Sequence, residues 1–295
     1  YSLAAMAAAL PRGWEIVPLL KVGSDLAEEA RDFLAGVPGL LLREGLRVVP
    51  EPNNRVELRY LDADRREEQL RGGVSPWSAR ELEPLLRDVD ALYVNFISGY
   101  EMELADAERL RAVFRGPIYA DLHSLLLGRM QDGRRTLRPL PEWRRWLRCF
   151  DAIQLNEDEL ATLAGRGGEE WAFAIEAVRD GGPMLIMVTL AGEGAECIYR
   201  TGVPANPLDW PLERNGAGRG RSAVRSSRVA PPQGRVEGDP TGCGDVWGST
   251  LFAALLGGLE IETAMRRAHT AAGHKVTYRG AAGLYSHLRS SISAG

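Results

Sequence analysis

The sequence predicts an α/β fold, a three-layer, doubly wound structure with helices on both faces of a mostly parallel sheet. Short, strongly apolar runs alternate along the chain with helical stretches, as expected of parallel strands that are buried on both faces. Polar residues follow several of these runs, at the strand ends where such sheets bind ligands. A glycine-rich turn then opens an apolar helix at residues 246–256.

The apolar pattern places the elements in chain order. Residues 2–10 are expected to form a packed amphipathic helix, 15–22 a buried strand, and 26–34 a helix capped by the preceding turn. Further strands are expected at 91–97, 118–122, 152–155 and 184–189. Helices are expected at about 78–87, 101–114, 142–148, 157–164, 169–180 and 261–277.

Residues 47–61 have a different character, because short β-type runs alternate there with prolines and asparagines. Residues 56–60 alternate apolar and charged side chains, which is typical of a half-exposed strand. On these residues alone, an ordinary surface hairpin is one interpretation.

Composition limits the classes of function. The chain has 295 residues and a net charge of −4, so no global field favours nucleic acid or an anionic membrane. No apolar run approaches the ~20 residues of a membrane span, and the apolar opening lacks the basic flank and cleavage site of a signal peptide. The three cysteines, without CxxC spacing, argue against zinc and for a reducing compartment, so we expect a cytoplasmic protein.

Lysine is rare in this sequence. Only Lys21 and Lys275 occur, and neither follows a glycine. A Walker A loop requires Gly-Lys-Ser/Thr, and a protein kinase requires a strand lysine and a His-Arg-Asp loop. Any phosphoryl transfer is therefore expected to depend on backbone dipoles, metal and arginine.

Six arginines and no acidic residue lie within residues 214–235. Such a stretch could contact nucleic acid, but aromatic residues are absent from it. Its glycine, serine and proline content favours a solvated, mobile loop.

The stretch Gly238-Asp239-Pro240-Thr241-Gly242-Cys243-Gly244-Asp245 is the strongest candidate for a functional site. Glycines let backbone N–H groups converge, and the following helix adds unpaired N–H donors and the positive end of its dipole. The result would be an anion site with one carboxylate at its mouth. Taken alone, a strand-to-helix turn with aspartate as the N-cap is an equally good interpretation.

Three other groups of residues lie at expected strand ends. Asn156 and Glu159 have the spacing of a capping box, which would satisfy the start of a helix without any further role. Residues 189–194 form a glycine-containing turn after the strand at 184–189. Asn95, Ser98 and Asp121 lie at the ends of expected strands and are candidate substrate contacts, and His123 is the one histidine at a position facing the site.

The octet ending in Asp245 resembles the signature Asp-Thr-x-Gly-Ala-Gly-Asp of the ribokinase-like (PfkB-type) carbohydrate kinase family, with Pro240 and Cys243 as variants. The resemblance implies that backbone amides of Gly242, Cys243 and Gly244 form an anion hole for the transferring phosphate. It also implies that Asp245 deprotonates the substrate hydroxyl.

The same resemblance extends from about residue 3 to residue 284 and assigns roles to the other groups. It implies that Asn156 and Glu159 organise Mg²⁺ and its waters. It places the nucleotide at Thr189, Gly192 and Gly194, although Ala191 stands where the family has glycine, and at Gly280, Ala281 and Gly283, which would wall the adenine pocket.

The resemblance also implies a division of the chain. Residues 1–44 and 76–295 would form the core that binds nucleotide and substrate, and 45–75 a small β lid through which family members often form homodimers. Family members begin with a core strand, an acidic sugar ligand and a Gly-Gly pair, whereas this sequence begins where the first helix is expected. We therefore expect a gap in the sheet beside residues 15–22.

The expected function is an ATP- and Mg²⁺-dependent kinase that phosphorylates a hydroxyl of a sugar or sugar-like molecule, without nucleic-acid or membrane partners. Two alternatives remain open at this point. One is a nucleoside kinase of the same family, and the other is a non-catalytic sensor of sugar or nucleotide.

Overall fold

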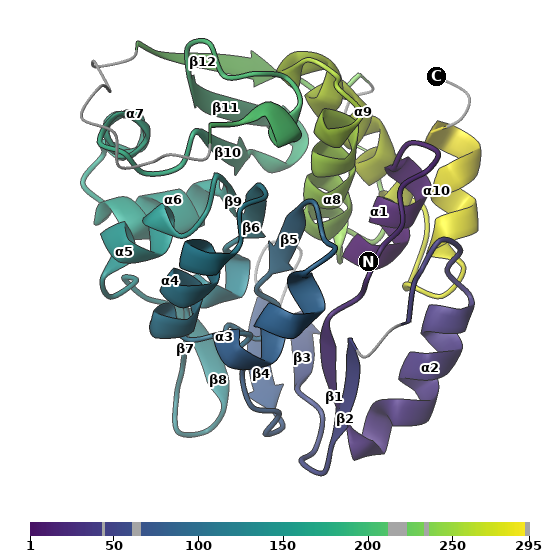
Figure 1. Cartoon of the computed structure of the whole chain (residues 1–295). Coiled ribbons are helices and arrows are strands. Elements are labelled where there is room, and N and C mark those ends of the chain that lie inside the picture. The colour runs from purple at the N-terminus through teal and green to yellow at the C-terminus, as the bar shows by residue number, and fades with distance from the viewer. Residues whose placement is uncertain (43–44, 61–65, 212–222, 233–235, 293–295) are drawn as a thin grey trace.

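A six-stranded sheet forms the centre of the computed structural model, which describes residues 1–295 except 43–44, 61–65, 212–222, 233–235 and 293–295. The strand order is β12-β11-β10-β9-β6-β5 (Figure 1). β5, β6, β9 and β10 are parallel, and β11 and β12 add an antiparallel edge. The strands span Leu92–Asn95 (β5), Ile118–Asp121 (β6), Ala152–Asn156 (β9), Leu185–Thr189 (β10), Ala195–Arg200 (β11) and Val224–Val229 (β12).

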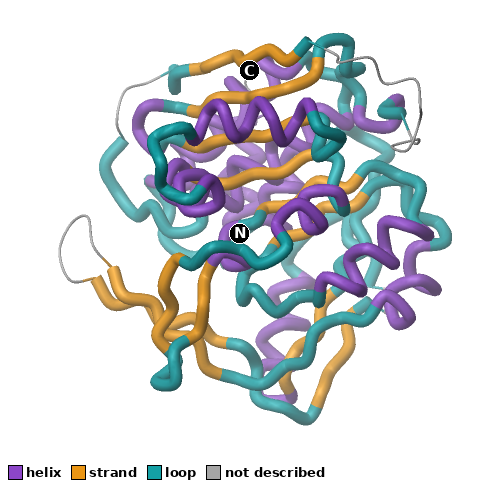
Figure 2. The backbone as a smooth tube through the Cα atoms, turned by 90° about the vertical axis from the view of Figure 1, so that its left-hand side faces the viewer, coloured by secondary structure: helices purple, strands orange, loops and turns teal. Residues whose placement is uncertain are grey.

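Helices cover both faces of this sheet, which confirms the predicted three-layer α/β fold (Figures 1 and 2). One layer contains α1 (Ser2–Ala9), α8 (Cys243–Leu256), α9 (Ile261–Val276) and α10 (Leu284–Ile292). The other contains α4 (Leu104–Val113), α5 (Trp143–Arg148), α6 (Glu157–Ala164) and α7 (Glu170–Arg179). Each layer packs on the sheet through its own cluster of buried apolar side chains.

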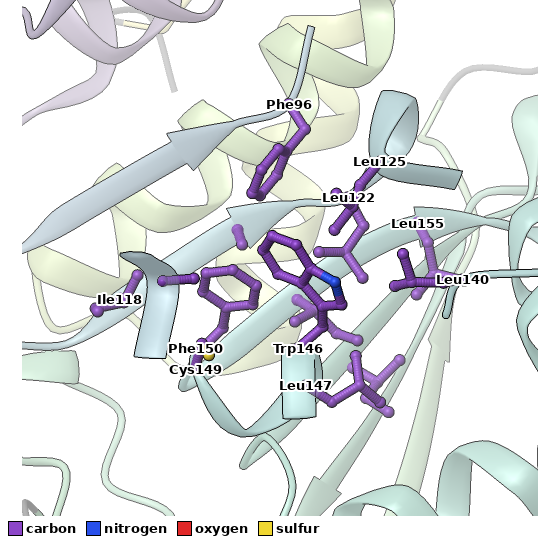
Figure 3. Close-up of a cluster of buried hydrophobic side chains, with 14 of the residues drawn as sticks. Phe96, Ile118, Leu122, Leu125, Leu140, Trp146, Leu147, Cys149, Phe150 and Leu155 are labelled. Carbon is purple, nitrogen blue, oxygen red and sulfur yellow. The ribbon is translucent and has the colours of Figure 1, made fainter. Parts of the chain in front are cut away.

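Aromatic side chains fill the core beneath α4 and α5 (Figure 3). The ring of Phe96 forms T-shaped contacts with Trp146, at 5.8 Å between centroids, and with Phe150, at 6.1 Å. All three are buried, and each such side chain contributes about 1.5–3 kcal/mol of apolar burial. This packing fixes the ends of β5 and β6, from which the site side chains project.

Two smaller sheets lie beyond the carboxyl ends of the central strands, in the lower part of Figure 1. One is antiparallel, in the order β3-β4-β8-β7, and the other pairs β1 and β2 in parallel. The strands are β1 (Leu20–Gly23), β2 (Leu46–Val49), β3 (Arg55–Tyr60), β4 (Arg66–Arg71), β7 (Leu127–Arg129) and β8 (Arg134–Leu137), and the nearby helices are α2 (Ala27–Ala35) and α3 (Ala79–Leu82). The strands of the expected lid segment, 45–75, are thus completed by β7 and β8 from elsewhere in the chain.

The prediction of a core strand at 15–22 is wrong in both its length and its position. Only Leu20–Gly23 is a strand, and it pairs with β2 outside the central sheet. Pro18 has no N–H to donate and interrupts the expected strand, leaving Ile16 in one isolated bridge to Leu40. Among the described strands β5 pairs only with β6 and forms the edge of the central sheet. The gap expected beside residues 15–22 therefore stays a prediction, because these residues do not lie in that sheet.

The arginine-rich stretch also differs from the expected loop. Residues 224–229 form the edge strand β12, paired with β11, while 212–222 and 233–235 lie outside the described residues. Arg225 and Arg228 point to solvent, and charged side chains of this kind protect an edge strand from further pairing. None of the described helices combines the length and the apolar character that a membrane span requires.

Candidate active site

The register of the parallel strands brings the predicted polar residues to one edge of the sheet. Asn95 at the end of β5 lies opposite Asp121 at the end of β6, and Asp121 lies opposite Gln154 of β9. Asn156 lies opposite Thr189 at the end of β10. Residues from four separate segments therefore share one row of strand ends.

The first turn of α8 lies against this row. Gly242 has φ of +81°, which turns the chain into α8 at Cys243, and Asp245 is the third helical residue. Asn95 Nδ2 donates a hydrogen bond to Asp245 Oδ1 at 2.6 Å, and Ser2 Oγ donates to the same oxygen at 3.2 Å. Two predicted site residues, Asn95 and Asp245, are thus in direct contact.

The three predicted anion-hole amides are not equivalent. The Cys243 N–H already donates to the Pro240 carbonyl at 3.0 Å. For Gly244 and Asp245, the structure shows no acceptor of the amide among the described residues, as expected for the first turn of a helix. The ring of Tyr1 lies so close to Gly242 that a Cβ at that position would overlap it.

Gln154 is a site residue that the sequence analysis missed. Its Nε2 donates to the Gly244 carbonyl at 3.0 Å and to Asp121 Oδ2 at 3.3 Å, and its Oε1 accepts from Tyr119 Oη at 3.0 Å. This buried amide joins the glycine turn to the sheet. The available signal was one glutamine within the otherwise apolar run of β9.

Asp121, His123 and Glu159 form a charged cluster beside Gln154. Burial raises the pKa of Asp121 to about 7, with smaller contributions from the charges of Asp245 and Glu159, against the opposing effect of His123. Burial alone would lower the pKa of His123, but its hydrogen bond to Glu159, at 2.6 Å between Nδ1 and Oε1, and the charge of Glu159 raise it to about 9. A protonated His123 therefore balances the carboxylates at the strand ends.

Asn156 and Glu159 form the predicted capping box at the start of α6. The Glu159 N–H donates to Asn156 Oδ1 at 2.9 Å, and the Asn156 N–H donates to Glu159 Oε2 at 2.8 Å. Asn156 Nδ2 also donates to Glu159 Oε1, the oxygen that contacts His123. Both carboxylate oxygens are therefore engaged, and the described residues contain no group of three or more His, Cys, Asp or Glu that could hold a metal ion. This donor set does not fit direct coordination of Mg²⁺.

The loop after β10 has the backbone expected of glycine at two positions. Gly194 has φ of +99°, and a Cβ there would overlap the Val229 carbonyl. Ala191, the residue that departs from the family pattern, has φ of +48°. Gly192 lies between them in a short 3-10 turn with open space around it.

We expect the substitution Ala191→Gly to stabilise the protein. A left-handed backbone costs an L-residue about 1–2 kcal/mol, whereas the added freedom of glycine in the unfolded chain costs about 0.4–1 kcal/mol. The difference predicts a gain of about 0.5–1 kcal/mol in the free energy of unfolding, measured by urea denaturation. Gly192→Ala is the control at the neighbouring position, and equal or lower stability of Ala191→Gly would contradict the strain at Ala191.

Other predicted residues are not joined to this network. Ser98 Oγ and its N–H donate to Glu101 Oε1, within a local turn. Gly280, Ala281 and Gly283 form the turn between α9 and α10, with positive φ at both glycines. No hydrogen bond or ion pair of the described residues connects this turn to Asp245.

Comparison with known proteins identifies the family of this chain. The model of the pfkB family carbohydrate kinases matches residues 131–287, more than half of the chain, and includes the glycine turn and Asp245. The chain belongs to the pfkB family of carbohydrate kinases. It is therefore a kinase by family, and the sequence-based recognition is confirmed.

Solved structures have the same fold as this pfkB-family chain. A nucleoside kinase from Burkholderia thailandensis in complex with inosine is 18% identical, with a TM-score of 0.69 over 99% of this chain and 82% of that one. A ribokinase from Thermotoga maritima is 17% identical, with a TM-score of 0.68 over 99% and 84%. A putative ribokinase II from E. coli, in complex with ATP and Mg²⁺, is 19% identical, with a TM-score of 0.70 over 100% and 87%. No curated protein sequence matches the chain.

Proposed function

We propose that this chain transfers the γ-phosphoryl group of ATP to a hydroxyl of a sugar or sugar-like small molecule, with Asp245 as the general base. The observation that carries the proposal is the placement of Asp245. Its carboxylate lies in the first turn of α8, held by Asn95 at 2.6 Å and next to helix amides with no acceptor among the described residues. A hydroxyl at this point would lose its proton where negative charge is stabilised.

Each residue has a distinct task in this proposal. Asp245 accepts the hydroxyl proton through the oxygen that Asn95 leaves available, Oδ2. The amides of Gly244 and Asp245, together with Gly242 and the dipole of α8, bind the phosphoryl oxygens. Gln154 holds the Gly244 carbonyl and so keeps the turn in place.

The nucleotide would bind beside the ends of β9 and β10. We place it against Thr189, Gly192 and Gly194, with the turn 280–283 as a wall for the base. The support is the shared strand edge of Thr189 and Asn156 and the solved relative that contains ATP and Mg²⁺. Asp121 and Asn95 would contact the acceptor directly. Ser98 would lie farther from it.

We propose that Mg²⁺ enters with the phosphates of the nucleotide, and that Asn156 and Glu159 act on it only through water. Magnesium commonly keeps several waters and takes its other ligands from substrate phosphates. The Glu159 oxygens already accept hydrogen bonds, which leaves contact through water as the way in which this carboxylate would act on the metal.

The substitution Glu159→Gln tests this role. Glutamine still serves a capping box, so α6 should remain folded, but loss of the charge paired with His123 should lower the thermal unfolding temperature. The concentration of Mg²⁺ for half-maximal activity should rise by about tenfold or more, the usual effect of an outer-sphere partner. Glu81→Gln is a matched control, since Ser78 and Glu81 form the same capping box in α3. An unchanged magnesium requirement in Glu159→Gln would leave Glu159 as a helix cap only.

The assay for the whole proposal is turnover of ATP with a panel of pentoses, hexoses and nucleosides. Phosphorylated product should form with at least one sugar and depend on Asp245. Preferential turnover of a nucleoside would identify the nucleoside-kinase alternative. Saturable binding of a sugar or nucleotide without turnover would identify the non-catalytic sensor.

A further inference from the structure

Lys275 is one of two lysines in the chain, and its side chain is completely buried at the last turn of α9. Its Nζ donates to the Asp239 carbonyl at 3.1 Å and lies 3.8 Å from Asp239 Oδ2. The ammonium also lies 5.2 Å from the centre of the Tyr1 ring, the ring that covers Gly242. A buried cation thus lies beneath the glycine turn.

The last turn of α9 is attached to the glycine turn by several contacts. The Asp239 N–H donates to the Val276 carbonyl at 2.9 Å, and Cys243 Sγ lies 3.7 Å from the Ala272 carbonyl. Asp239 Oδ1 accepts from the Thr241 N–H at 3.0 Å. The position of Nζ is therefore fixed relative to the amides at the start of α8.

The charge of Lys275 is incompletely balanced by Asp239. An ammonium has three N–H donors, and the structure shows one hydrogen-bond acceptor for it among the described residues, the Asp239 carbonyl. The Asp239 carboxylate is 28% exposed and lies beyond hydrogen-bond distance. A buried cation with so few partners is costly unless an anion comes close to it.

The field of Lys275 extends to the turn itself. Burial raises the pKa of the Cys243 thiol to about 11, and the positive charge of Lys275 is the largest opposing effect. Burial opposes ionisation of the Asp239 carboxyl, but hydrogen bonds from Thr241 lower its pKa, and the charges of Lys275 and Arg279 add to this effect. A phosphate at the turn would lie within this field.

We propose that Lys275 is a positioning residue that supplies a fixed positive charge beneath the anion-binding turn of Gly242–Asp245. It acts through the turn on the phosphate of the donor, and this inference rests on the proposed kinase function. The sequence predicts that positive charge for phosphoryl transfer comes from backbone dipoles, metal and arginine. The proposal adds a lysine 30 positions after Asp245 to these sources.

The experiment compares Lys275→Met with Lys21→Met. Methionine keeps most of the side-chain volume and removes the charge, and Lys21 is a similarly buried lysine paired with Glu81 at 3.0 Å, away from the turn. We expect Lys275→Met to lower kcat by about 10- to 100-fold, somewhat less than the loss of a direct oxyanion donor. The KM for the acceptor should remain within about twofold of the wild-type value, because the substitution does not change the contacts that bind the acceptor.

A second measurement does not require turnover. Sulfate and inorganic pyrophosphate should raise the thermal unfolding temperature of the wild-type protein by binding to the turn. This stabilisation should be lost in Lys275→Met and retained in Lys21→Met. The anion assay therefore tests the inference even where the proposed kinase activity fails in every acceptor assay.

The double variant Lys275→Met/Asp239→Asn separates charge from structure. Asp239→Asn keeps a side-chain oxygen for the Thr241 N–H and removes the negative charge that Lys275→Met would leave without its cation, so this variant also covers the case in which Lys275→Met alone does not fold. We expect the double variant to fold and to remain as defective as Lys275→Met in kcat and in anion stabilisation. Recovery of wild-type values, or a Lys275→Met protein with wild-type kcat and anion stabilisation, would overturn the inference.

Discussion

Replacing Asp245 with asparagine is expected to lower kcat by about 10²- to 10⁴-fold, the usual contribution of a positioned general base. Asparagine is nearly isosteric and still presents an oxygen to Asn95 Nδ2 and Ser2 Oγ, so the contacts that hold residue 245 are retained. The variant should fold and should bind ATP about as well as the wild type. Turnover with the best acceptor, and calorimetric titration with ATP, provide the two measurements.

The control is Asp209→Asn, the same chemical change at an exposed aspartate in a short 3-10 turn. It should have wild-type kcat. If Asp245→Asn kept more than about a tenth of the wild-type rate, the loss would be too small for a general base, and another group would have to accept the proton.

Gly248→Ala is expected to give the largest loss of stability. Gly248 is buried within α8, and a Cβ there would overlap Gln154 Oε1 and lie 2.9 Å from Tyr93 Oη. Overpacking of a buried site costs about 1–3 kcal/mol, which is a large part of the ~5–15 kcal/mol that stabilises a domain. Displaced Gln154 would also release the Gly244 carbonyl, so we expect kcat to fall in the fraction that remains folded.

Gly273→Ala is the matched control. Gly273 lies near the carboxyl end of α9, where the nearest atom to an added Cβ is a Val236 methyl at 4.0 Å. Alanine favours a helix over glycine by about 1 kcal/mol, so this variant should be slightly more stable than the wild type. Urea denaturation gives the free energy of unfolding of both variants. Equal changes in this free energy would show that contact with Gln154 does not limit the size of residue 248.

The sequence predicts the strands of the central sheet well because their side chains are buried on both faces. The apolar runs at 118–122 and 152–155 correspond to β6 and β9 within one or two residues. The expected strand at 15–22 fails because apolar composition does not reveal its partners, and Pro18 removes a donor in its middle. Which strands pair with one another depends on the whole fold and not on the residues of one strand.

The candidate site could be predicted from the sequence where it depends on local chain geometry. The glycine turn, the capping box and the strand-end positions of Asn95 and Asp121 all follow from nearby residues. The hydrogen bond between Asn95 and Asp245 joins residues 150 positions apart and depends on the packing of α8 against β5. Gln154 and Lys275 were missed because an isolated polar residue in an apolar run, or at a helix end, gives no sign of the tertiary contact that it makes.

The burial of both lysines has a consequence for the chemistry of the folded surface. The Lys21 side chain is 6% exposed and that of Lys275 is not exposed. Amine-directed reagents will therefore modify either ε-amine only after local opening, of β1 in one case and of the end of α9 in the other. The rate of acylation at each lysine therefore measures how often that segment opens. A phosphate-like anion that binds the turn should lower the acylation rate at Lys275 without changing the rate at Lys21.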